Sequence, residues 1–152
     1  RFPKEMEAVK KELETATGLT LLARTKRAYE THPNIQRLSE NTVNAIASEY
    51  AGQDVDIMSG SMGMDHDTAK EILEHSRCND YGVYAECLII AVKQKLPITM
   101  REVEGLEWET PDQFAREIEK SGYIQWLHEF ESLSEWHKRT KLIQDSADEL
   151  IR

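Results

Sequence analysis

The side chains best suited to chemistry lie in one short stretch, from Met62 to Asp67, and at His75. The stretch brings together thioether, carboxylate and imidazole groups, all of which bind metal ions. If His66, Asp67 and His75 held one divalent ion, the chain would be a metal-dependent hydrolase, because such an ion activates a bound water molecule. An aspartate at a helix start, however, also caps the helix and complements its dipole. We favour this capping role and expect neither a metal nor a cofactor, with the hydrolase kept as an alternative.

Other catalytic patterns are weaker. Cys78 follows His75 by three residues, a spacing that permits contact on one helix face, but Cys78 precedes a turn and is expected to be exposed. A calcium loop beginning at Asp54 fails because Met58 occupies a ligand position and Ser59 the position of the sharp-turn glycine. No serine lies in the G-x-S-x-G pattern of a nucleophile elbow. The sequence therefore favours a protein that is not an enzyme.

The charge of the chain is strongly acidic and unevenly distributed. Its 152 residues include 19 Lys and Arg against 28 Asp and Glu, a net charge of −9, so a nucleic-acid partner is not expected. Residues 1–51 are nearly neutral, and the negative charge belongs to the remainder. Basic side chains in the first part predict a contact rim, formed by Lys10, Lys11, Arg24, Lys26 and Arg27.

A dense acidic segment lies in the last third of the chain and contains one aromatic residue. Its members are Glu102, Glu104, Glu107, Trp108, Glu109 and Asp112. Carboxylates around an aromatic anchor are typical of a docking surface for a basic protein, because rim charge steers association and a buried Trp holds the partner. In the alternative, Trp108 packs against Phe114 at a helix start. The sequence thus predicts a protein-binding adaptor or assembly subunit, which could also form an oligomer.

The elements that must position these residues read as helices. Apolar residues recur at helical spacing before Gly18 and Gly52, and the segment from Leu19 to Tyr29 reads as a short helix. Thr99 with Glu102 and Ser132 with Glu135 have the spacing of capping boxes, and for residues 83–95 we favour a helix over a strand. We predict an all-α fold, an irregular bundle of seven or eight short helices in one domain over residues 1–152, with an internal hinge at 52–64.

Two of the predicted helices, at 68–77 and 83–95, suggest a third function, that of a helix-turn-helix regulator. The second helix has Lys93 and Lys95 only at its far end, whereas such proteins read bases near the start of the recognition helix. The helix-turn-helix is therefore a weaker alternative than the protein-binding module.

The expected compartment is the cytoplasm. The two cysteines, Cys78 and Cys87, have no CxxC spacing and are too few for a disulfide framework, so we expect both to be reduced. The longest apolar run, residues 87–92, is far shorter than the roughly 20 residues of a membrane span. Because the chain begins with Arg1, we expect a processed or truncated N-terminus.

Overall fold

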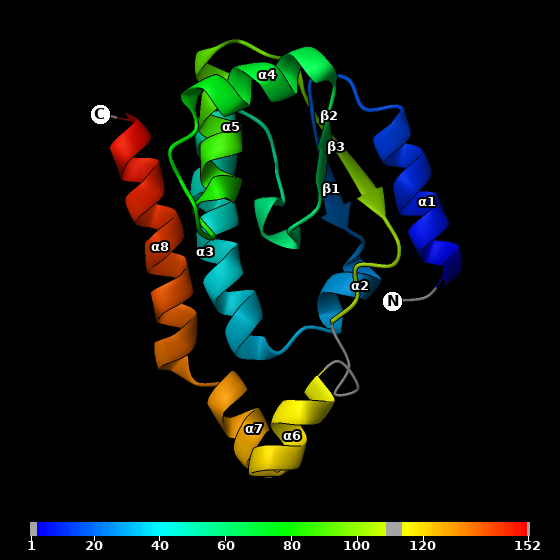
Figure 1. The fold of residues 1–152 in the computed structure, drawn as a ribbon, viewed down its shortest axis with the longest axis vertical. Coiled ribbons are helices and arrows are strands. Elements are labelled where there is room, and N and C mark those ends of the chain that lie inside the picture. Colours follow the sequence, from blue (N-terminus) through cyan, green and yellow to red (C-terminus); the bar gives the residue numbers. More distant parts are fainter. Residues whose placement is uncertain (1–2, 109–113, 152) are drawn as a thin grey trace.

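The computed structural model describes residues 3–108 and 114–151 (Figure 1). The elements follow one another in the order α1 (Pro3–Glu14), β1 (Leu19–Arg24), α2 (Lys26–Glu30), α3 (Asn34–Ala51), the short 3-10 helix η1 (Ile57–Ser59), β2 (Met62–Met64), α4 (His66–His75), α5 (Val83–Lys93), β3 (Ile98–Val103), α6 (Ala115–Ser121), α7 (Tyr123–Phe130) and α8 (Leu133–Ile151).

Three strands, which are separated by helices along the chain, form one mixed sheet, so the all-α prediction is wrong. The strand order is β2-β1-β3. The central strand β1 pairs in parallel with β3, where Leu19 lies opposite Ile98, and antiparallel with β2, where Leu19 lies opposite Met64. The fold is therefore a mixture of helices and sheet, with helices in the majority.

The strands were missed because their patterns also suit helices. All six residues of β1 are buried, so the strand lacks the alternation of apolar and polar residues that marks a half-exposed strand. The Thr99 to Glu102 spacing resembles a capping box, but both residues belong to β3. In addition, β1 takes its partners from segments more than 40 residues away, and no local pattern reports such pairing.

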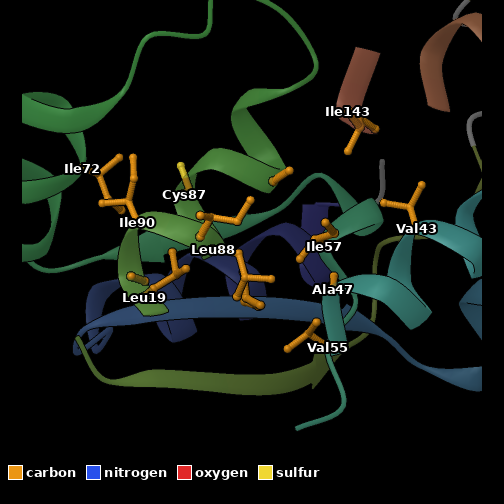
Figure 2. Close-up of a cluster of buried hydrophobic side chains, with 14 residues drawn as sticks. Leu19, Val43, Ala47, Val55, Ile57, Ile72, Cys87, Leu88, Ile90 and Ile143 are labelled. Carbon is orange, nitrogen blue, oxygen red and sulfur yellow. The ribbon is translucent and has the colours of Figure 1, made fainter. Parts of the chain in front are cut away.

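Helices cover the sheet from both sides. Figure 1 shows α1 on one side of the strands and α3, α5 and α8 on the other. Most side chains of the main core come from β1, α3, α5 and α8, as shown in Figure 2 by Leu19, Val43, Ala47, Cys87, Leu88 and Ile143. The main core therefore lies between the sheet and the helices α3, α5 and α8.

Helix α5 is the centre of that core. Its residues from Ala85 to Ala91 are all buried. The helix favoured for 83–95 is confirmed, although it ends at Lys93. No helix in the described ranges combines the length and apolar character needed to cross a membrane.

Candidate functional site

The three candidate metal ligands lie on one helix but do not form one site. His66 and Asp67 are at the start of α4, with 3.2 Å between His66 Nδ1 and Asp67 Oδ1, and their side chains are almost fully exposed. His75 comes nine residues after His66, so it lies about 13 Å further along the helix axis and on the face opposite to His66. Within the described ranges, no three metal-ligating side chains are gathered. The hydrolase alternative therefore has no assembled centre at these residues.

Capping occurs at Asp65, the residue just before them. Its Oδ1 accepts a hydrogen bond from the Thr68 N–H at 2.8 Å, and its Oδ2 accepts one from the Gly18 N–H at 2.7 Å. These backbone hydrogen bonds lower the pKa of Asp65 below its usual value. The carboxylate thus holds the start of α4 against the start of β1.

The acidic segment lies against one member of the basic rim. Arg27 Nη2 donates to Glu104 Oε2 at 2.5 Å and also to Glu107 Oε1. The hydrogen bond to Glu104, with the charges of both carboxylates, raises the pKa of Arg27. Glu102 is exposed on β3. Two of the predicted docking carboxylates are thus already occupied by a guanidinium of the same chain.

The structure does not bring the residues of the predicted basic rim together. Lys10 and Lys11 are exposed on α1, Lys26 is exposed on α2, and Arg24 is buried. Glu109 and Asp112 lie outside the described residues.

Trp108 is part of an aromatic cluster and not a projecting anchor. Its ring stacks on Trp126 at 6.5 Å between centroids and meets Phe130 edge to face at 5.7 Å. Phe114 contacts the same two rings, at 5.1 and 5.6 Å. The alternative, in which Trp108 packs near Phe114, describes this arrangement better than the docking role.

Arg24 belongs to a buried ion network that sequence reasoning missed. Its Nη1 donates to Glu40 Oε2 at 2.6 Å, while Nε and Nη2 donate to the two oxygens of Asp56 at 2.9 and 2.8 Å. Asn44 donates to Asp56 from α3 at 2.8 Å. The network joins β1, α3 and the segment before η1. No local signal identifies it, because its members are 12 to 32 residues apart.

The pKa values of the network follow from burial and pairing. Burial raises the pKa of Glu40, and Arg24 only partly offsets it. Burial also acts to raise the pKa of Asp56, but the hydrogen bonds and charge of Arg24 outweigh it, so that pKa is lowered. Asp56 lies within 52–64, so these bonds hold that point of the segment to β1 and α3; the hinge stays a prediction.

The helix-turn-helix alternative needs an exposed second helix. In this fold α5 is buried along most of its length, so it is not available to a DNA groove.

Glu86 on α5 is buried and accepts hydrogen bonds from the N–H groups of Arg77 and Cys78, at 3.1 Å each. This carboxylate fixes the turn that connects α4 to α5.

An uncharged surface lies on the outer side of α3. The exposed residues between Ile35 and Ser48, here called the α3 face, are Leu38, Asn41, Thr42, Ala45 and Ile46. Leu38 is 67% exposed and Ile46 is 55% exposed. Next to this face, a cavity of about 140 Å³ opens between α3, α5 and α8, lined by Ile46, Tyr50 and Ala147 among others.

A second, larger cavity lies where the first turn of α3, η1, α7, α8 and the segment after β3 meet. This cavity, here called the aromatic pocket, has a volume of about 360 Å³. Rings of Tyr81, Trp108, Phe130 and Trp136 line it, together with the guanidinium-bearing Arg139.

Comparison with known proteins finds no matching family model, no matching curated protein and no matching solved structure. The functional proposals below therefore depend on the geometry of this chain.

Proposed function

We propose that the chain is a non-enzymatic subunit of a protein assembly and that it docks through the α3 face onto a second copy of itself. The observation that carries this proposal is the α3 face, where five successive exposed residues carry no charge until Glu49, the next exposed residue of the helix. Charged residues make up 31% of the chain, so such a surface is unusual for it. Exposed Leu and Ile side chains at helical spacing are typical of a surface that another helix covers.

The lack of charge on this surface allows a second copy to dock there. With a net charge of −9, two copies repel each other over most orientations. Placing like charges opposite each other in an interface costs several kcal/mol. A pair joined through the α3 face avoids that cost, because the five exposed residues of this face are uncharged and Glu40, which lies between them in sequence, is buried against Arg24.

The spacing along α3 also suits a twofold axis. Leu38 and Ile46 lie four residues on either side of Thr42, and about 12 Å separates them along the helix. If two α3 helices cross antiparallel at Thr42, Leu38 of each copy meets Ile46 of the other. Such a self-complementary contact is the arrangement that a twofold dimer requires. The cavity beside Ile46 gives the opposing side chain a place to enter.

The experiment compares the mass of the chain in solution with that of two variants. Ile46→Glu places a carboxylate in the proposed contact, and Leu73→Glu is the matched control, since Leu73 is a 78% exposed leucine on α4. Light scattering coupled to gel filtration should give a dimer mass for the native chain and for Leu73→Glu, and a monomer mass for Ile46→Glu. A native chain that stays monomeric over the whole accessible concentration range refutes the proposal, as does an Ile46→Glu variant that remains a dimer.

We propose the acidic segment as a second, weaker surface for a basic partner. Its support is that Glu104 and Glu107 are already placed to bind one guanidinium, that of Arg27. A partner arginine would have to replace Arg27, so Arg27→Ala should strengthen the capture of a basic partner and Glu104→Gln with Glu107→Gln should weaken it. Equal capture by all three forms would exclude this surface.

We also propose a reducing, cytoplasmic location. Its support is that Cys78 and Cys87, which both lie in the described part of the chain, form no disulfide there. Fluorescence microscopy of the tagged chain in its native cells tests the location, and an extracellular signal would exclude it.

A further inference from the structure

We propose that the aromatic pocket binds a small aromatic carboxylate, with its ring against the Trp108, Phe130 and Trp136 rings that line the pocket and its carboxylate on Arg139. This proposal does not depend on the α3 face, because the two sites share no residue.

The size and lining of the pocket fit a small ligand. Its volume of about 360 Å³ falls in the range of small-molecule sites, which begins near 300 Å³ and combines apolar or aromatic walls with a few polar groups. The cavity beside the α3 face, at about 140 Å³, is well below that range. The polar groups of the aromatic pocket include His32, Gln36, Ser59 and Arg139.

The aromatic walls are held in place by hydrogen bonds from both sides. The Trp108 backbone N–H donates to Thr31 Oγ1 at 2.8 Å, which fixes that wall to the end of α2. Trp136 Nε1 donates to the Phe130 carbonyl oxygen at 3.0 Å, which fixes the opposite wall. Phe130 meets Trp136 edge to face at 6.0 Å between centroids. A planar ligand therefore finds ring surfaces that are already ordered, which reduces the entropy lost on binding.

Arg139 supplies the charge that selects the ligand. Its guanidinium lies over the Trp136 ring at 4.8 Å and over the Tyr81 ring at 5.9 Å. Within the described ranges it forms no salt bridge, although its charge helps to lower the pKa of Glu135 one turn earlier on α8, whereas Arg24 and Arg27 each bind two carboxylates. A guanidinium that lies over a ring face still carries its N–H donors in its own plane, in a fork that matches the two oxygens of a carboxylate.

The other ionisable groups that line the pocket do not pair with this positive charge. Glu107 lines the pocket, but its charge is paired with Arg27. His32 Nδ1 lies 3.0 Å from the Ala28 carbonyl oxygen, which makes Nδ1 the protonated nitrogen of the neutral ring. Burial, together with the charge of Arg24, lowers the pKa of His32, so the ring is uncharged at neutral pH. Arg139 therefore gives the pocket its preference for an anion.

These features together define the ligand class. A small inorganic anion would leave the aromatic walls unused, and an uncharged aromatic compound would leave the guanidinium unpaired. A flat ring bearing a carboxylate satisfies both, so 2-naphthoate is a suitable probe and 2-naphthamide is its neutral counterpart of nearly the same shape.

The three tryptophans of the chain make the binding observable. Trp108 and Trp136 line the pocket and Trp126 contacts Trp108. In a two-dimensional nitrogen-proton spectrum, the indole N–H signals should shift on titration with 2-naphthoate. The titration also gives the affinity.

We expect 2-naphthoate to bind the native chain at least about tenfold more tightly than 2-naphthamide, since a hydrogen bond to a charged group contributes about that factor or more. Arg139→Gln should abolish this preference, and the control Arg101→Gln, on β3, should keep it. Absence of indole shifts at millimolar naphthoate would overturn the proposal. So would equal affinity for acid and amide, a comparison that needs only the native chain and therefore does not depend on the folding of any variant.

Discussion

The buried network around Arg24 gives the strongest stability prediction, tested by the change Arg24→Met. Methionine fills a similar volume but removes the guanidinium from two carboxylates. The Arg24 side chain is 2% exposed and that of Glu40 4% exposed, while that of Asp56 is 15% exposed. The change therefore leaves two negative charges with little access to water.

The magnitude follows from the burial of those charges. Removing one partner of a buried ion pair costs about 3 to 5 kcal/mol, because the remaining charge stays desolvated. Total unfolding free energies are about 5 to 15 kcal/mol, so the loss is a large part of the stability. With a urea slope of about 2 kcal/mol per molar, the unfolding midpoint should fall by about 2 M. Adding Glu40→Gln to Arg24→Met removes one stranded charge and should restore part of the loss.

The assay is urea unfolding followed by circular dichroism, with Arg101→Met as the matched control. Arg101 pairs with Glu12 on the surface, where the two side chains are 40% and 37% exposed, and such pairs contribute about 0 to 1 kcal/mol. If Arg24→Met costs no more than Arg101→Met, the network does not stabilise the fold as argued.

Three further predictions follow from single residues. Gly18→Ala should lower the free energy of unfolding by about 2 kcal/mol or more, since Gly18 has φ +62° and a Cβ there would lie 2.2 Å from a backbone carbonyl oxygen. The control Gly52→Ala, at φ +68° with no atom within 4 Å of the added Cβ, should cost clearly less. Equal losses of stability in thermal unfolding would contradict the steric argument. Folding lowers the pKa of Asp56, so its carboxylate stabilises the fold fully above the ordinary carboxyl pKa of about 4, and this stabilisation is lost as the pH falls below that value. Asp56→Asn should therefore reduce the loss of unfolding free energy at acid pH, and an unchanged loss would exclude this role. Burial raises the pKa of Cys87 to about 11, so a thiol reagent at pH 8 should react quickly with Cys78 alone in the native protein and with both thiols in urea, and two fast native reactions would contradict the burial of Cys87.

Local patterns predicted the helices well where one face is apolar and a turn residue ends the element. The segment before Gly52 forms α3, and Gly52 adopts the left-handed conformation that ends it. The apolar run from Val83 forms α5, as its length indicated. The same reasoning failed at β1, because a fully buried strand and a buried helix are both continuous apolar runs.

The candidate sites were harder to predict because each depends on contacts between distant segments. The acidic residues were identified in the sequence, but their pairing with Arg27 joins positions about 80 residues apart. Arg24 was grouped with the surface cations, and only the packing of α3 and the η1 segment around β1 removes it from solvent.

The sequence by itself determined the acidic charge and the positions of most helix ends, because these depend on residue type and local spacing alone. The tertiary structure decided which apolar segments became strands and which charges were buried. It also decided where the aromatic residues gathered beside Arg139. These outcomes depend on pairing and burial between residues far apart in the chain, and the energy of such contacts is set by their three-dimensional surroundings and not by their neighbours in sequence.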